Sequence, residues 1–190
     1  MKLILTEENH NEYYHKGVEL LEPYILLMEA SPAINKDAKK SIVEGIRYLD
    51  AVTEINQHNF AAFWIKGKGY QALGNHEDAY TQFEKSFRLN KNNPDVAREL
   101  ALECINLGKG EQAVEFMRHA LTLDSTDPGL VANLALAYLI NGNLDLASST
   151  VEKAITLAPT DEINHNLKKI IDEVIAGQRA QPKKYEDLNI

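Results

Sequence analysis

The chain has 190 residues, of which 44% are hydrophobic and 25% are charged, and its formal net charge is −8. This composition is typical of a globular protein and excludes a disordered chain, which lacks the apolar content for a core. The negative charge argues against nucleic acid and against an anionic membrane surface as partners, because both attract a basic face. The single cysteine, Cys104, excludes an internal disulfide and is consistent with a reducing compartment.

The start of the chain does not resemble a targeting segment. Only residues 3–5 form an apolar run there, and this run is too short for the core of a signal peptide. No apolar stretch approaches the roughly 20 residues of a membrane-spanning helix. We therefore expect a soluble, cytoplasmic protein without membrane insertion.

Residues 1–58 are predicted to contain two helices. The first runs from about residue 11 to residue 28, and Pro23 is expected to kink or split it because proline removes a helical hydrogen bond. A longer connection follows at Ser31-Pro32. The second helix is predicted from apolar residues at helical spacing between Ile42 and Ile55, with Asn35 as its N-cap.

The following part of the chain contains an internal repeat. Five series of residues recur with a period of 34 (108 − 74 and 142 − 108) and without gaps. The series are Gly74, Gly108 and Gly142; Ala79, Ala113 and Ala147; Ser86, Ala120 and Ala154; Leu89, Leu123 and Leu157; and Asn59, Asn93, Asp127 and Asp161.

Each series has a physical reason. The Asn and Asp residues are preferred N-caps and start the first helix of each unit, and a proline follows Asn93 and Asp127 at the first helical position. The glycines end that helix in the left-handed conformation. Asn75 and Asn143 come directly after and are predicted to cap the second helix. Each unit is therefore predicted to be two antiparallel helices of about fourteen residues, joined by a tight turn and stacked as in a solenoid.

This pattern resembles the tetratricopeptide repeat, on its glycine and alanine positions and its late apolar residues. The resemblance implies three repeats at about 60–93, 94–127 and 128–161. Lys66 departs from it, because the family usually has a leucine there. Gly45 and Leu49 lie one period before Ala79 and Phe83, which suggests a degenerate fourth repeat.

The last predicted helix lies beyond Asp161. Apolar residues recur at helical spacing from Ile163 to Ile175, and Gly177 is expected to end this capping helix. The predicted fold is an all-α, right-handed α-solenoid with three full repeats, a degenerate N-terminal unit and a capping helix. We expect an N-terminal segment at 1–58, the repeats with the capping helix at 59–176, and a flexible tail at 177–190.

The sequence contains no motif typical of catalysis, of nucleotide binding or of metal binding. It has no Walker A loop, no Gly-x-Gly-x-x-Gly and no His-Glu-x-x-His, and its six histidines are spread along the chain. Residues 67–69 (Gly-Lys-Gly) lie inside a predicted repeat helix, so they do not form a phosphate loop. Cys104 takes the position of Tyr70 and Tyr138 in other repeats and is predicted to be a buried packing residue. We assign no catalytic residue, no metal ligand and no cofactor.

Binding is expected on the concave side, which the first helices line in a right-handed stack of such hairpins. Its mixed aliphatic, aromatic and charged positions are typical of an interface. The candidate groove residues are Trp64, Ile65, Lys68, Arg98, Glu99, Leu102, Asn133, Leu136 and Ile140. An alternative stays open, in which the N-terminal helices cover Trp64 and the capping helix covers Leu136 and Ile140.

One specialisation of the family can be tested by residue. Tetratricopeptide cochaperones that hold the acidic ends of heat-shock chaperones use lysine, asparagine and arginine at fixed inward positions. Here these positions hold Trp64, Lys68, Glu99, Gly129 and Asn133. Glu99 would repel a carboxylate, so we reject this clamp.

The leading hypothesis is a non-catalytic scaffold or adaptor that binds a peptide or helix of a protein partner. Trp64, Arg98, Leu102, Leu136 and Ile140 are its proposed anchors. One alternative is a self-associating structural protein, a homodimer. Another is a chaperone like those of type III secretion, which shield apolar translocator segments. An enzyme would require a cluster of titratable residues in a pocket, which the sequence does not indicate.

Overall fold

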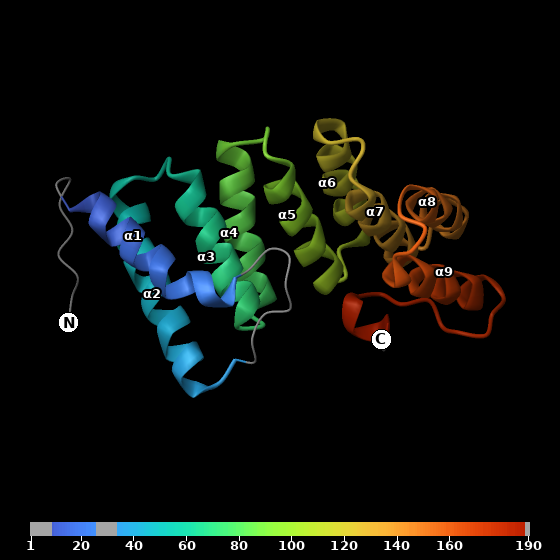
Figure 1. The fold of residues 1–190 in the computed structure, drawn as a ribbon, viewed down its shortest axis with the longest axis horizontal. Coiled ribbons are helices and arrows are strands. Elements are labelled where there is room, and N and C mark those ends of the chain that lie inside the picture. Colours follow the sequence, from blue (N-terminus) through green and yellow to red (C-terminus); the bar gives the residue numbers. More distant parts are fainter. Residues whose placement is uncertain (1–8, 26–33, 189–190) are drawn as a thin grey trace. The chain divides into compact units, whose positions relative to one another are not determined.

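The structure is a computed structural model that describes residues 9–25 and 34–188 (Figure 1). In these ranges all regular secondary structure is helical. The α-helices are α1 (His10–Leu21), α2 (Lys36–Ile55), α3 (Phe60–Ala72), α4 (His76–Leu89), α5 (Pro94–Asn106), α6 (Gly110–Leu123), α7 (Pro128–Asn141), α8 (Leu144–Leu157) and α9 (Glu162–Ile175), and the 3-10 helices are η1 (Glu22–Tyr24) and η2 (Tyr185–Leu188).

The chain divides into two compact units. Unit 1 is Met1–Lys91 and unit 2 is Asn92–Ile190. The predicted boundary at residue 58 therefore differs from the structural one, because the first predicted repeat, α3 with α4, clusters with α1 and α2. None of the helices described is long and apolar enough to cross a membrane.

The predicted N-caps start the first helix of each repeat. The side chain of Asn59 accepts a hydrogen bond from Ala62 N at 3.0 Å, and that of Asn93 accepts from Asp95 N at 2.9 Å. Asp127, Asp161 and Asn35 cap their helices in the same way. A side-chain oxygen satisfies an amide that has no partner inside the helix.

The turns within the repeats follow the prediction with one exception. Gly74, Gly108 and Gly142 have φ angles of 71°, 70° and 82°, the left-handed region that glycine occupies without steric cost. The expected cap at Asn143 was wrong: its side chain caps no amide of α8. Instead its Oδ1 accepts a hydrogen bond from Asn141 Nδ2 at 2.7 Å.

In unit 1 the helices α1 and α2 pack as an antiparallel pair, and α3 and α4 as another (Figure 1). Close approach requires glycine at both contacts. A Cβ on Gly17 would lie 2.7 Å from Leu49 Cγ, and a Cβ on Gly67 would lie 2.6 Å from the ring of Phe83. The α1–α2 pair thus has the packing of a repeat hairpin, and its assignment as a degenerate repeat stays a prediction.

The predicted break at Pro23 is confirmed. The α-helix ends at Leu21, and the proline lies in the 3-10 turn η1 that follows. Proline fits there because the first turn of a helix needs no N–H partner. The predicted end of this helix near residue 28 and the Ser31-Pro32 link lie outside the described residues.

In unit 2 two hairpins, α5–α6 and α7–α8, are followed by α9, which packs on α8 and α7. Helix α7 is buried around most of its circumference, from Leu130 to Ile140, because other helices contact it on several sides. Such a helix is apolar all round, without an amphipathic pattern. Helix α9 ends at Ile175, and Gly177 follows it in the left-handed conformation with a φ of 68°, at the place predicted for the helix end.

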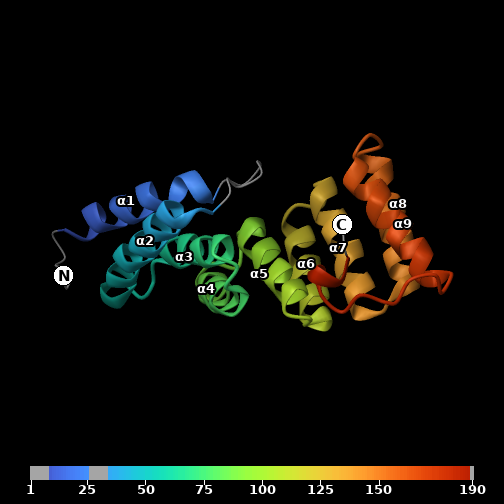
Figure 2. The same ribbon diagram turned by 90° about the horizontal axis from the view of Figure 1, so that it is seen from below.

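Residues 178–188 differ from the predicted flexible tail. They run from the end of α9 back along unit 2, and their 3-10 helix η2 contacts α5 (Figure 2). Leu188 is 1% exposed, and Pro182 is also buried. Composition alone gave the wrong expectation here, because two well-placed apolar residues fix a segment that is otherwise polar. We call residues 178–188 the docked segment.

Candidate partner-binding site

The nine predicted groove residues divide between the two units. Trp64, Ile65 and Lys68 lie on α3 in unit 1, and the other six lie on α5 and α7 in unit 2. The two sets are therefore described separately. A single groove across all three repeats stays a prediction.

In unit 1 the groove residues lie beside the N-terminal helices. Trp64 is half-buried and packs against the core cluster that includes Leu21 and Ile46 of α1 and α2. Its indole Nε1 is buried and has no hydrogen-bond partner among the described residues. Ile65 belongs to the same core cluster. This arrangement is the one expected if the N-terminal helices fill this face.

Lys68 lines a small open pocket on the same helix. The pocket has a volume of about 230 Å³ and is lined by Tyr24, Ile25, Lys68, Gln71 and Ala72. Lys68 Nζ donates a hydrogen bond to Gln71 Oε1 at 2.6 Å. Tyr24 and Ile25 follow α1, so the N-terminal segment borders the predicted face at this pocket.

In unit 2 the predicted residues differ in exposure. Leu136 and Ile140 on α7 are buried, which leaves little of either side chain for a partner. Leu102 and Asn133 are half-buried, on α5 and α7 respectively. The helices α5 and α7 contact one another directly, so these two residues belong to neighbouring helices.

The charged residues of α5 form a local pair. Arg98 Nη2 lies 2.9 Å from Asp95 Oδ1 and 3.9 Å from Glu99 Oε1. Glu99 is 4% exposed, whereas the Arg98 side chain is 21% exposed and stays accessible. Ala132, which precedes the groove residue Asn133 on α7, is buried in a cluster with Val131 and Ala154, so it packs inside the unit.

The docked segment lies at the ends of these same helices. A Cβ on Gly108, just after α5, would be 3.3 Å from the carbonyl oxygen of Lys183. A Cβ on Gly142, just after α7, would be 2.9 Å from the side-chain amide of Gln181. The segment thus passes close to the two turns that glycine forms, and it then contacts α5 through η2.

The amide of Gln181 anchors the segment to α7. In one orientation its oxygen accepts hydrogen bonds from Gly142 N at 3.1 Å and from Lys183 Nζ at 3.3 Å. The opposite orientation gives only longer bonds of 3.4 Å, from Nε2 to the carbonyl oxygens of Leu139 and Ile140. We assign the first, because shorter bonds are stronger, and either one holds Gln181 at the end of α7.

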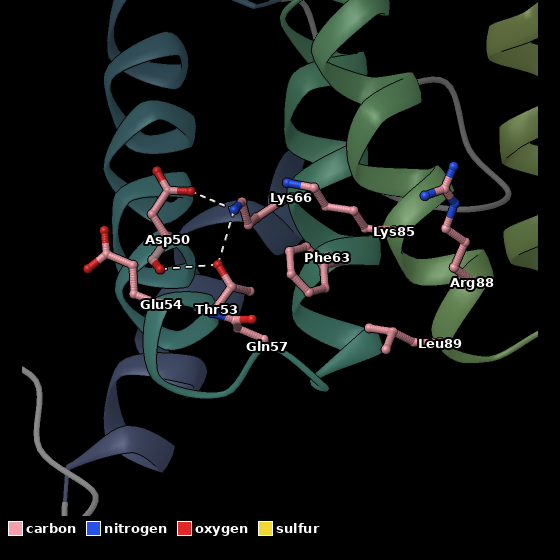
Figure 3. Close-up of a pocket in the computed structure, with 9 residues that line it drawn as sticks. All are labelled: Asp50, Thr53, Glu54, Gln57, Phe63, Lys66, Lys85, Arg88 and Leu89. Carbon is pink, nitrogen blue, oxygen red and sulfur yellow. Dashed lines mark hydrogen bonds and ion pairs between the residues drawn. The ribbon is translucent and has the colours of Figure 1, made fainter.

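A larger pocket in unit 1 was not predicted. It has a volume of about 590 Å³ and is open to solvent (Figure 3). Its lining residues come from the end of α2, from α3 and from α4, and they are Asp50, Thr53, Glu54, Gln57, Phe63, Lys66, Lys85, Arg88 and Leu89. The one signal in the sequence was Lys66, which replaces the family's usual leucine.

The pocket has an acidic and a basic side. Asp50 and Glu54 lie on α2, and Lys85 lies opposite on α4 (Figure 3). Lys66 Nζ is buried between them, 2.6 Å from Asp50 Oδ1. The ammonium groups of Lys66 and Lys85 lie 5.4 and 5.5 Å from the ring centroid of Phe63, at cation–π distance.

The inner residues of this pocket bond to one another and so contribute to the stability of the protein itself. Lys66 also donates to Thr53 Oγ1 at 3.2 Å, so its charge is compensated within the protein. Lys85 and Arg88 at the rim can contact charged groups of another molecule. Among residues 9–25 and 34–188 no group of three or more His, Cys, Asp or Glu side chains is placed to hold a metal ion.

Comparison with known proteins agrees with the repeat pattern. The tetratricopeptide-repeat family profile matches residues 99–127 and 129–161, the second and third predicted repeats. A curated TPR repeat-containing protein of Methanocaldococcus jannaschii is 33% identical over 72 residues, which are 37% of this chain. The match spans only 12% of that protein's length.

Solved structures share the fold at low sequence identity. A crystal structure of MamA protein has a TM-score of 0.74 at 19% identity, and the match covers 90% of this chain and 85% of that one. The first TPR domain of Spaghetti, solved with an HSP90 peptide, has a TM-score of 0.58 at 20% identity, covering 62% of this chain and 93% of that domain. Together with the stacked helix hairpins, these similarities show an all-α helical solenoid, and residues 99–127 and 129–161 are tetratricopeptide repeats.

Proposed function

We propose that this chain is a non-catalytic protein-interaction scaffold, and that unit 2 binds a peptide segment of a partner on the face formed by α5 and α7. The observation that carries the proposal is the docked segment, a stretch with a single short 3-10 helix lying on the ends of these helices. A surface that accommodates such a segment of its own chain has the shape and the hydrogen-bonding groups to accommodate one from another protein.

The structural neighbours support the same role. The first TPR domain of Spaghetti was solved bound to an HSP90 peptide, and the second TPR domain of human RPAP3 in complex with an HSP70 peptide. Those partners do not transfer to this chain. Glu99 occupies a clamp position with a buried carboxylate, which disfavours a peptide that ends in carboxylates.

Three predicted groove residues remain accessible in unit 2. Arg98, Leu102 and Asn133 are half-buried, so each has an exposed part that a partner can cover. Leu136 and Ile140 are buried and leave little surface for a partner. We propose that Arg98, Leu102 and Asn133 contact the partner directly, with Leu102 as the apolar anchor. The cytoplasm stays the expected compartment.

The proposal is tested by affinity capture from lysate of the source cells, with bound proteins identified by mass spectrometry. Leu102→Glu is compared with Leu123→Glu, the same change at a side chain that is 38% exposed on α6. A partner retained by the native chain and by Leu123→Glu but lost by Leu102→Glu is the expected result. Identical sets of proteins from all three chains, with helicity unchanged, would refute the role of this face.

A second outcome distinguishes self-association. If the native chain captures only further copies of itself, and Leu102→Glu abolishes this capture, the face is a homodimer interface. Light scattering at two protein concentrations then gives the molar mass directly. A monomer at micromolar concentration excludes this alternative.

A further inference from the structure

The docked segment combines three attachments that are separated along the sequence. Gln181 bonds to the end of α7, Leu188 is buried where η2 contacts α5, and Asp187 shapes the turn between them. Asp187 Oδ2 accepts hydrogen bonds from the backbone N–H groups of Lys183 and Lys184 at 2.8 and 3.1 Å. The segment therefore presents a defined set of groups to unit 2, and this set resembles that of a bound peptide ligand.

The segment depends on the surface beneath it for its conformation. The helix η2 has only four residues, and a helix of this length is not stable by itself because its nucleation costs more than one turn returns. Arg179 Nη2 donates to the carbonyl oxygen of Leu188, and Arg179 Nη1 lies 3.6 Å from Glu173 Oε2 of α9. These bonds close the segment onto the end of α9. The segment belongs to none of the repeat helices, so it can detach without unfolding a repeat.

The connection to α9 permits such detachment. Residues 176–178 are exposed, and a Cβ on Gly177 would meet no atom of the part of the chain that the structure describes within 4 Å. No packed side chain must be broken there for the segment to swing away. The link that leads to the docked segment is thus free of the repeats, while Gln181 and Leu188 hold its other part.

We propose that the docked segment is an exchangeable, built-in ligand of unit 2, and that the same surface binds in trans a partner peptide of matching chemistry. The matching peptide carries an amide side chain, then an aspartate that caps a short turn, and directly after it a leucine, spaced as in Gln181, Asp187 and Leu188. This inference rests on the proposed function, and it adds the class of partner and the internal competition that the partner must overcome.

The docked segment competes with any other peptide for the same surface of unit 2, and the stronger binder occupies it. A segment tied by a short link has an effective concentration of about millimolar at its own site. A second copy of the same segment brings no additional contact, so it does not displace the first at micromolar concentration. A partner peptide that also contacts Arg98, Leu102 and Asn133, which remain partly exposed, gains the affinity to do so. We therefore assign the site to a foreign peptide and not to a second copy.

The test uses the full chain and a fluorescent peptide with the sequence of residues 178–190. Leu188→Asp in the full chain removes the buried anchor and frees the surface, because a buried unpaired carboxylate is strongly disfavoured. Leu157→Asp is the matched control, since Leu157 is 52% exposed on α8 of the same unit. Peptide binding is measured by fluorescence anisotropy, and folding by circular dichroism and thermal unfolding.

The Leu188→Asp chain is expected to bind the peptide at least tenfold more tightly than the native chain and the Leu157→Asp chain do. A peptide that itself carries Leu188→Asp is expected not to bind. If the folded Leu188→Asp chain does not bind the native peptide, the surface is not an exchangeable site and the inference is wrong. Equal binding by all three chains would also overturn it, because the segment would then not compete.

A second variant covers the case in which Leu188→Asp does not fold. Gln181→Ala with Arg179→Ala removes polar attachments only and is expected to raise peptide affinity at least threefold over the native chain. No increase would contradict the inference. Light scattering that finds a dimer of the native chain, dissociated by Leu188→Asp, would replace the foreign peptide with a second copy. If the inference fails while Leu102→Glu still abolishes capture of a partner, the proposed function stands without it.

Discussion

The ammonium group of Lys66 lies 2.6 Å from Asp50 Oδ1, with the lysine side chain buried and the aspartate half-exposed. The pair joins α3 to α2, so it connects the first full repeat with the N-terminal pair of helices. Phe63 lies beside the same ammonium group. A lysine thus occupies the position of the family's usual leucine, because a carboxylate and a hydroxyl are placed to receive it.

Removing the aspartate of this pair is expected to cost more than removing the lysine, because the lysine is buried and the aspartate reaches solvent. Asp50→Asn leaves the buried Lys66 charge without its counter-ion and is expected to lower the free energy of unfolding by about 1–2 kcal/mol, less than for a fully buried pair because Asp50 reaches solvent. Lys66→Leu, which restores an apolar side chain, is expected to be neutral or stabilising.

Urea unfolding monitored by circular dichroism measures both variants, and the double variant Asp50→Asn, Lys66→Leu completes the cycle. The double variant is expected to be close to Lys66→Leu alone. If Lys66→Leu destabilises the protein as much as Asp50→Asn does, the pair contributes net stability and this reasoning is wrong.

The contact between Gly142 and Gln181 predicts a difference between two glycine substitutions. Gly74 and Gly142 both have positive φ angles, so alanine at either is expected to cost about 1–2 kcal/mol in backbone strain. A Cβ on Gly74 meets no atom within 4 Å, whereas one on Gly142 lies 2.9 Å from the Gln181 amide. Gly142→Ala is therefore expected also to loosen the docked segment.

Hydrogen exchange at the amides of Lys183 and Lys184 reports this loosening, because both donate to Asp187 in the docked conformation. Exchange there is expected to accelerate in Gly142→Ala and to stay unchanged in Gly74→Ala. Equal exchange in the two variants would show that the segment does not depend on the Gly142 turn.

Asn93, which caps a helix, and Asn143, which does not, allow the contribution of a cap to stability to be measured. Asn93→Ala removes an oxygen that accepts from Asp95 N and Val96 N, and it is expected to lower the free energy of unfolding by about 1 kcal/mol. Asn143→Ala removes no cap bond from α8 and is expected to cost less. Thermal unfolding of the two variants compares them, and a larger loss in Asn143→Ala would contradict the observed cap geometry.

Tyr70 predicts a loss of stability at high pH. Burial, with smaller contributions from the carboxylates of Asp50 and Asp78, raises the pKa of Tyr70 above its ordinary value of 10.0. A raised pKa in the folded state means that the neutral phenol contributes stability below the unfolded pKa. This contribution is lost as the pH rises through the folded pKa.

Tyr70→Phe is therefore expected to lose less stability than the native chain between about pH 8 and about pH 11. Tyr185→Phe, at a tyrosine that is exposed, is the control and is expected to follow the native chain. Urea midpoints at the two pH values measure the difference. Identical losses in Tyr70→Phe and the native chain would exclude Tyr70 as the group responsible.

Much of the fold could be predicted because its signals are local. A period of 34, the caps at Asn93 and Asp127 and the turn at Gly108 act through neighbouring residues, so they are readable from one sequence. The break at Pro23 is of the same kind. These features specify the helix boundaries and the hairpins, and they carry the resemblance to the tetratricopeptide repeat.

The candidate site was only partly predictable. The repeat placed Leu102, Asn133 and Leu136 on first helices, but it did not show that Leu136 would be buried and Leu102 half-exposed. Likewise Lys66 was recognised as a departure from the family, but its partner Asp50 lies on another helix. Exposure and pairing depend on which elements pack together, and the periodicity contains no such information.

The sequence by itself determined an acidic, all-helical repeat protein with its caps, turns and hairpins, because each of these depends on residues within one or two helical turns. Only the tertiary structure decided that residues 178–188 return to unit 2 and that Gln181 meets Gly142 there. Those contacts join residues far apart in the chain. Their stability comes from burying Leu188 and from bonds to helix ends, and both exist only after the repeats have folded.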